Sequence, residues 1–269
     1  MSALLDVTGL SKTFRYHTGL FRRHTVEAVH PLDLSLDEGK TLAIIGENGS
    51  GKSTLAKLIA GMVEPTQGEI RVHGERLWYG DYRHRCKLIR MIFQDPNTSL
   101  NPKMQIGQIL EGPLKLNTDL TAQERENRII ATLRKVGLLP DHASVYPQML
   151  ATGQKQRVSL ARSLILEPKI IVADEALTQL DMSMRSQILN LMLELQENLG
   201  ISYIYVSQHM GVVKHISDKV LVMQQGHVVE RGDTKTVFCD PQHDLTRRMI
   251  ESHFGEVLTP AAWERPVEI

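Results

Sequence analysis

The chain has 269 residues with 31 basic and 31 acidic side chains, so its formal net charge is zero. A hydrophobic fraction of 42% and a charged fraction of 23% are typical of an ordinary globular protein. Because the charges balance, no overall field favours nucleic acid or an anionic membrane, and we expect no nucleic-acid partner. Apolar runs fall short of the ~20 residues that span a bilayer, so we expect membrane contact only through partner proteins.

The two cysteines and the N-terminal residues indicate a reducing compartment. Cys86 and Cys239 form neither a metal-type cluster nor a disulfide framework, and we interpret both as small packing residues. Residues 1–6 lack the charged and then apolar regions of a signal peptide. We therefore expect a cytoplasmic location.

The N-terminal part of the chain is predicted to be rich in β-structure. Residues 4–7 and 26–29 are candidate strands, and a basic, aromatic insert lies between them at 14–23. Residues 68–72 and 89–93 are further short strands.

Between these strands lies a glycine-rich segment, residues 46–54, which we call the phosphate loop. It follows an apolar run and precedes a helix-like run, the context in which G-x-x-x-x-G-K-[ST] binds phosphate. The glycines allow backbone N–H groups to turn inward, and the N-terminus of the helix favours the same anion. Lys52 is expected to reach the β- and γ-phosphates, and Ser53 to ligate Mg²⁺. The alternative is a glycine turn before an ordinary helix. The segment predicts nucleoside triphosphate binding by Gly46, Glu47, Asn48, Gly49, Ser50, Gly51, Lys52, Ser53 and Thr54.

The character of the chain changes after Asp95. Three prolines interrupt residues 95–113, and Thr121 to Glu124 has the spacing of a capping box. Apolar residues behind that box recur on one helical face. The pattern predicts a helical subdomain inserted into an α/β core.

The core resumes with a continuous apolar strand that ends at Asp174 and Glu175. A helix is predicted over residues 182–198, a strand over 201–206, and a hairpin turn at Gln225 and Gly226. The expected domains are a nucleotide-binding core with a β subdomain (1–94 and 161–235), a helical subdomain (95–160), and a C-terminal helix and tail (236–269).

Six motifs occur in a specific order, and together they resemble the ATP-binding subunits of ABC transporters. The resemblance spans roughly residues 10–230. In chain order the motifs are the phosphate loop, a Q-loop at Phe93-Gln94-Asp95-Pro96, a signature segment at Leu150–Gln154 where the family reads L-S-G-G-Q, the Walker B pair Asp174-Glu175, a D-loop ending at Leu180-Asp181, and a switch histidine at His209.

A narrower resemblance points to the oligopeptide and dipeptide (Opp/Dpp) branch of this family. Residues 93–102 read FQDPNTSLNP and resemble the branch's F-Q-D-P-x-x-S-L-N-P run, and residues 146–147 and 243–247 fit the same branch. Within it, residues 153–157 and 181–185 resemble the ATP-binding subunits of Sap-type systems. These systems are associated with antimicrobial-peptide resistance and putrescine transport.

The resemblance implies a role for each motif. Asp174 would hold Mg²⁺, partly through water, and Glu175 would be the general base that polarises the attacking water. Gln94 would bind Mg²⁺ or that water, and His209 would reach the γ-phosphate. Phe14 would stack on adenine, with Tyr16 as the alternative.

Each of these residues also has a plainer interpretation. An Asp-Glu pair after a strand can be a helix N-terminus with stabilising acids. Gln94 can be a polar residue that ends a strand, and a lone histidine such as His209 is more often a surface or core residue. Phe14 and Tyr16 can be ordinary packing aromatics.

The signature segment departs from the family pattern. Ala151 replaces a serine whose hydroxyl would donate to a γ-phosphate oxygen, and Thr152 replaces a glycine, while Gly153 and Gln154 are kept. The D-loop has Thr178-Gln179 where the family usually has Ser-Ala. In this family each ATP lies between one subunit's phosphate loop and the other's signature. A homodimer would carry the weakened signature at both sites, so we predict a heterodimer with a second ATPase.

The expected fold class is α/β: a P-loop NTPase of the ABC nucleotide-binding type, with an N-terminal antiparallel β region and an inserted helical subdomain. The expected function is ATP hydrolysis that energises transport of peptides or small cationic substrates, with ATP and Mg²⁺ as cofactors. The expected partners are two integral membrane permease subunits and a second ABC ATPase, on the cytoplasmic face of the bacterial inner membrane.

Two alternatives stay open. One is a soluble ABC ATPase that acts on ribosomes or DNA. Repair-type members of the family have long coiled coils between the phosphate loop and the signature, whereas here only about 100 residues without sustained heptads separate Lys52 from Leu150. The other is a weakly hydrolysing regulatory subunit, which the altered signature favours and the intact Glu175 and His209 oppose. Because Cys239 is the single cysteine near the C-terminus, we predict no iron–sulfur cluster.

Overall fold

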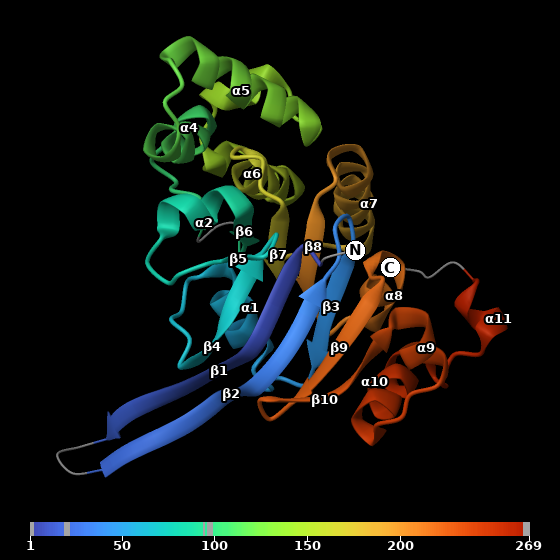
Figure 1. Cartoon of the computed structure of the whole chain (residues 1–269). Coiled ribbons are helices and arrows are strands. Elements are labelled where there is room, and N and C mark those ends of the chain that lie inside the picture. The colour runs from blue at the N-terminus through green and yellow to red at the C-terminus, as the bar shows by residue number, and fades with distance from the viewer. Residues whose placement is uncertain (1–2, 19–21, 94, 96–98, 266–269) are drawn as a thin grey trace. The chain divides into compact units, whose positions relative to one another are not determined.

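The computed structural model describes residues 3–18, 22–93, 95 and 99–265 (Figure 1). The chain divides into two compact units. The first comprises Met1–Tyr82 with Ser202–Ile269, and the second comprises Arg83–Ile201. The finer division expected from the sequence, with a helical subdomain at 95–160, stays a prediction.

The first unit contains a four-stranded antiparallel sheet in the order β2-β1-β4-β5. Strands β1 and β2 form the long hairpin that is blue in Figure 1, and their pairing extends to Thr18 opposite Arg22. The sequence predicted an insert at residues 14–23. In the structure residues 14–18 continue β1, and residues 22–23 begin β2. The β-branched and aromatic residues of this stretch favour extended pairing, which explains the difference. The strands are β1 (Leu5–Thr18), β2 (Arg22–Leu36), β4 (Gln67–Val72) and β5 (Glu75–Arg76).

A second, mainly parallel set of strands in this unit has the order β10-β9-β3-β8. Strand β3 pairs in parallel with both neighbours, and Ile44 lies opposite Val206 and Leu221. Every residue of β3 and β8 is buried, as their apolar sequences predict. The carboxyl ends of β3 and β8 consequently lie at the same edge of the sheet. The elements are β3 (Thr41–Gly46), α1 (Lys52–Ala60), β8 (Ser202–Val206), β9 (Lys219–Gln224) and β10 (His227–Asp233).

The predicted hairpin turn between β9 and β10 is confirmed. Gln225 and Gly226 have φ angles of 47° and 82°, the two left-handed residues that a tight two-residue hairpin requires.

Three helices follow β10 where the sequence led us to expect one helix and a loose tail. His243 caps the middle helix, and Gly255 ends it with a φ of 84°. The ring of Trp263 lies 5.9 Å from that of Phe238, which belongs to a buried cluster that includes Ile45 of β3. This apolar packing holds the segment in place. These three helices are α9 (Thr234–Cys239), α10 (Asp244–Phe254) and α11 (Pro260–Trp263), while α8 (Met210–Ile216) lies earlier, between β8 and β9.

The second unit is largely helical and contains one parallel strand pair, β6 with β7. The predicted capping box is confirmed, because the Thr121 hydroxyl accepts from Glu124 N and the Glu124 carboxylate accepts from Thr121 N. The helix predicted at 182–198 is also confirmed. The elements are α2 (Tyr82–Leu88, which begins at the boundary), β6 (Ile89–Ile92), α4 (Ile106–Asn117), α5 (Ala122–Lys135), the 3₁₀ helices η1 (Pro140–Ser144) and η2 (Pro147–Met149), α6 (Thr152–Leu164), β7 (Ile170–Asp174) and α7 (Met182–Leu199).

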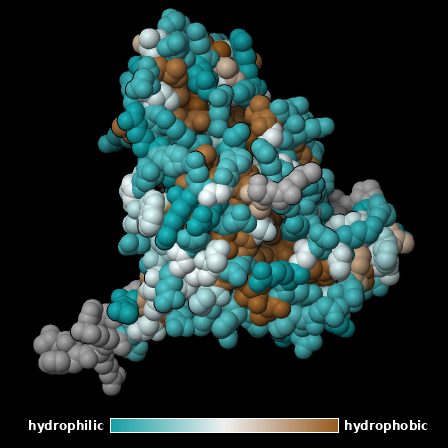
Figure 2. All heavy atoms as spheres, in the orientation of Figure 1, coloured by the Kyte–Doolittle hydropathy of each residue, from teal (hydrophilic) through white to brown (hydrophobic). Residues whose placement is uncertain are grey.

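Hydrophilic residues cover much of the face drawn in Figure 2, and apolar residues form smaller groups between them. Among the helices that the structure describes, none has both the length and the apolar character needed to cross a bilayer.

Candidate functional site

The phosphate loop is a tight turn in which two glycines leave no room for a side chain. Gly46 has a φ of 148° and Gly51 a φ of 101°. A Cβ atom at Gly46 would collide with the carbonyl oxygen of Met223, and one at Gly51 with that of Ala28. Gly51 immediately precedes α1 and offers no side-chain cap, so the first N–H groups of α1 face the loop. This geometry explains both glycines and suits an anion.

We predict that Gly51→Ala lowers the free energy of unfolding by about 1–3 kcal/mol, because the methyl group clashes with backbone and the φ is left-handed. Gly112→Ala is the matched control, since a Cβ there meets no atom within 4 Å and lies in helix α4. The control should stabilise by about 0.5–1 kcal/mol. Urea denaturation of both variants measures the difference, and equal stabilities would contradict the assigned loop geometry.

Lys52 lies inside this turn, with only 4% of its surface exposed. Its ammonium donates to the carbonyl oxygens of Gly46 at 2.8 Å and Glu47 at 2.7 Å, and lies 3.4 Å from Ser50 Oγ. A buried charge requires such compensation. Phosphate oxygens accept more strongly than carbonyl oxygens because they are charged. The ammonium is thus positioned where a phosphate group would be stabilised.

The same edge of the sheet carries His209. Ser207 N donates to Ile44 O at 3.2 Å, which joins the ends of β8 and β3. His209 is the N-cap of α8, and its Nδ1 accepts from Val212 N at 3.4 Å. The structure thus brings His209 and the phosphate loop to one sheet edge.

Gln208, which was not among the predicted site residues, links the two motifs directly. Its Nε2 donates to Asn48 Oδ1 of the phosphate loop at 2.7 Å. An amide residue at the end of a buried strand, beside a proposed catalytic histidine, was the available signal.

Phe14 lies on β1 opposite Val26 of β2, with the Lys12 ammonium 5.1 Å from its ring centroid. Strand β2 also supplies Ala28, whose carbonyl oxygen borders Gly51. Adenine stacking by Phe14 stays a prediction. The side chain of Tyr16 lies outside the described residues.

In the second unit, β7 ends at Asp174, which is 9% exposed. Glu175 follows with a φ of 47°, a left-handed conformation that a residue with a Cβ rarely adopts. The Thr178 N–H and hydroxyl donate to Glu175 O at 3.3 Å and 2.9 Å and hold this turn. Buried Gln156, which the sequence analysis did not single out, donates to Ala176 O at 2.8 Å and ties α6 to the turn.

The signature segment begins α6. Ala151 is the N-cap and makes no side-chain cap bond, and the Gln154 side chain accepts from Ala151 N at 3.0 Å. A Cβ at Gly153 would lie 2.9 Å from Met184 Sδ, so this glycine fits closely against α7. Ala151 therefore leaves the start of α6 without the hydroxyl that serine would supply.

The predicted residues thus fall into two groups. The first unit holds Phe14, the phosphate loop and His209, and the second holds Ala151, Gly153, Gln154, Asp174 and Glu175. Gln94 lies outside the described residues.

Among the residues that are described, no group of three or more His, Cys, Asp and Glu side chains is suited to a metal. The predicted Mg²⁺ ligands, a hydroxyl and a carboxylate, are nevertheless the oxygen donors that this ion prefers.

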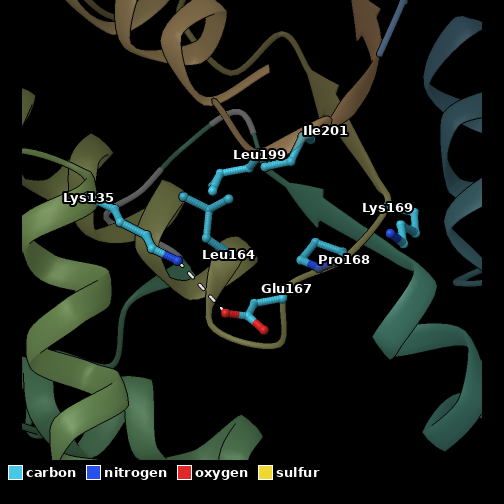
Figure 3. Close-up of a pocket in the computed structure, with 7 residues that line it drawn as sticks. All are labelled: Lys135, Leu164, Glu167, Pro168, Lys169, Leu199 and Ile201. Carbon is cyan, nitrogen blue, oxygen red and sulfur yellow. Dashed lines mark ion pairs between the residues drawn. The ribbon is translucent and has the colours of Figure 1, made fainter. Parts of the chain in front are cut away.

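One pocket of the second unit involves none of these motifs (Figure 3). It encloses about 220 Å³, and its lining includes the aliphatic Leu164, Leu199 and Ile201. At this pocket Lys135 Nζ lies 3.7 Å from Glu167 Oε1, and Glu167 has a φ of 53°. The pocket is small for a ligand site and is separate from the nucleotide motifs.

Comparison with known proteins decides the family. Residues 29–178 match the model of the family described as ABC transporter. The chain belongs to the ABC transporter family. It is 66% identical to the putrescine export system ATP-binding protein SapF of Escherichia coli strain K12 over 98% of this chain and 99% of that protein. It is 65% identical, with the same coverage, to the peptide transport system ATP-binding protein SapF of Salmonella typhimurium.

A solved ABC structure shows the same fold. A dimer of the ATP-binding cassette MJ0796, in a post-hydrolysis state bound to ADP and Pi, matches with a TM-score of 0.74 and 27% identity. The match covers 86% of this chain and 98% of that chain.

These findings confirm the predicted family, fold class and activity. The chain is an ABC-type ATP-binding subunit with an antiparallel β region and a helical subdomain, and it hydrolyses ATP to energise transport. Homologous subunits work within ABC transporter complexes together with permease subunits.

Proposed function

We propose that this ABC subunit binds ATP with the phosphate loop and cleaves it with Glu175 as general base. Lys52 neutralises the β- and γ-phosphates, and His209 donates to the γ-phosphate. Phe14 stacks on adenine, and Gln94 orients the attacking water. The compensated ammonium of Lys52 and the turn that holds Glu175 support these roles.

Mg²⁺ is proposed to be held by Ser53, Gln94 and, through water, Asp174. When bound, the ion neutralises charge on the phosphate oxygens. The chain's own residues position the reactants. The nearly buried Asp174 ends β7, where a carboxylate needs a cation or hydrogen-bond donors.

We further propose an asymmetric heterodimer with a second ABC ATPase. The observation that carries this proposal is Ala151 at the N-cap of α6, without a side-chain cap bond. The dimeric ADP-bound relative supports pairing of cassettes. Ala151, Gly153 and Gln154 would face the partner's nucleotide, while this chain's intact phosphate loop and Glu175 would face the partner's signature.

The proposed setting is a peripheral position on the cytoplasmic face of the bacterial inner membrane, with two integral permease subunits. Within the chain, the nucleotide-binding core comprises 1–94 and 161–235, the signature subdomain 95–160 and the C-terminal part 236–269. The cargo is a peptide or a small cation such as putrescine. The names of the two similar relatives support both cargo classes at nearly equal identity.

The asymmetry makes the hydrolysis rate depend on the partner. We predict that the purified chain hydrolyses Mg-ATP about 10- to 100-fold more slowly than an equimolar mixture with its partner ATPase. The reason is that a hydrogen bond to a charged group contributes about 1.5–3 kcal/mol, which corresponds to that range of rates. Restoring the family residues with Ala151→Ser, which supplies the hydroxyl, and Thr152→Gly, which removes the extra side chain, should raise the rate of the chain alone by about 10-fold or more.

Ala131→Ser is the control, because it adds the same hydroxyl to an exposed position of α5. It should leave the rate unchanged. If the chain alone is as fast as the mixture, the heterodimer proposal is wrong.

A further inference from the structure

A second histidine contacts the proposed switch histidine from the C-terminal part of the chain. His253 lies on α10, and its ring centroid is 4.8 Å from that of His209, with the rings inclined by 68°. The Nε2 atom of His253 accepts from Gly211 N at 3.1 Å, across 42 positions of sequence. Thus α10 reaches the segment that carries His209.

The two histidines satisfy successive donors at the start of α8. The N–H groups in the first turn of a helix have no partner within the helix. His253 accepts from Gly211 N, and His209 Nδ1 accepts from the next one, Val212 N. The first turn of α8 is therefore held from both sides.

This arrangement sets the position of the proton on each ring. A neutral imidazole has one protonated and one accepting nitrogen. Because His209 accepts at Nδ1, the neutral ring carries its proton on Nε2, the nitrogen that would donate to a phosphate oxygen in the proposed role. Because His253 accepts at Nε2, its proton resides on Nδ1. Desolvation lowers the pKa of His253 and so favours the neutral form that this acceptor role requires.

His253 is itself held by the packing of the C-terminal helices. Its ring lies 4.6 Å from that of Phe254, which lies 6.3 Å from Phe238 in the buried cluster. Ile250, one turn earlier on α10, is fully buried in the same cluster. The C-terminal helices thus connect the core to the ring that touches His209.

We propose that His253 is a positioning residue, which holds the His209 ring and the first turn of α8 in the orientation that offers Nε2–H for hydrolysis. The proposal rests on the proposed role of His209 toward the γ-phosphate. It also assigns a role to the C-terminal helices, for which the sequence provided none.

Steady-state hydrolysis by the assembled ATPase pair tests this proposal. His253→Ala should lower kcat about 10-fold and leave the KM for ATP within about twofold, because a small displacement of a catalytic group slows chemistry more than binding. His253→Gln should restore most of the rate, since its side-chain oxygen can accept from Gly211 N. His243→Ala is the control, because it removes a histidine that caps the N-terminal end of the same helix through Leu245 N, whereas His253 lies near the other end. If the control loses as much activity, or if Gln fails to rescue, His253 has only a structural role.

The imidazole nitrogens report positioning independently of activity. Long-range ¹H–¹⁵N spectra of the ¹⁵N-histidine-labelled full chain should show His209 protonated at Nε2, and a tautomer mixture in His253→Ala. An unchanged His209 tautomer in that variant would overturn the inference. His209→Ala in the same hydrolysis assay separates the proposed role of His209 from the proposed role of His253. Full activity of that variant refutes the role of His209 in hydrolysis. The spectra still decide whether His253 orients the His209 ring.

Discussion

Glu175→Gln is expected to reduce ATP hydrolysis by at least about 100-fold, which is the usual contribution of a general base. The variant should still bind ATP with an affinity within about threefold, because glutamine has the same shape and the phosphate loop is unchanged. The turn at Glu175 is held through its backbone oxygen by Thr178, so the substitution should preserve the local fold. Phosphate release and nucleotide binding, measured on the same preparation, check both parts.

Glu197→Gln provides the matched control for this prediction. Glu197 is an exposed residue of α7, so its substitution makes the same chemical change outside the motif. The Glu197→Gln variant should hydrolyse ATP at the rate of the unmodified chain. If Glu175→Gln keeps more than about a tenth of the activity, another group serves as the base.

Lys52→Met is expected to weaken ATP binding about 10- to 100-fold and to abolish most hydrolysis, because charge-assisted bonds to phosphate contribute about 1.5–3 kcal/mol. Methionine keeps much of the length and apolar stem of lysine and removes the charge. It also leaves the carbonyl oxygens of Gly46 and Glu47 without the ammonium donor that satisfies them. Nucleotide titration of the purified chain measures the loss.

This pattern differs from that of Glu175→Gln, which should retain binding. Lys57→Met on the same helix is the control and should bind ATP normally. Wild-type affinity in Lys52→Met would show that the ammonium does not contact phosphate.

Local sequence patterns determined much of the fold because they act over a few residues. The capping box at Thr121, the turn at Gln225-Gly226 and the helix from Met182 each follow from side chains within one or two turns. The sequence set residues 14–23 apart as a basic, aromatic insert between two strands, whereas pairing of β1 with β2 extends both strands into it. The C-terminal segment up to Arg265 forms more helix than the one helix expected there, because the partly buried Trp263 packs against the buried Phe238.

By itself, the sequence determined the family, the fold class and the residues of the phosphate loop, because motif order and glycine spacing are local chemistry. Only the tertiary structure decided which distant groups meet. Gln208 reaches Asn48 across 160 positions, and His253 reaches Gly211 across 42. No local periodicity encodes such pairs, since they arise when parallel strands end at one edge and a C-terminal helix packs on the same core. The contact between the rings of His253 and His209 likewise comes from this packing and does not follow from the order of residues.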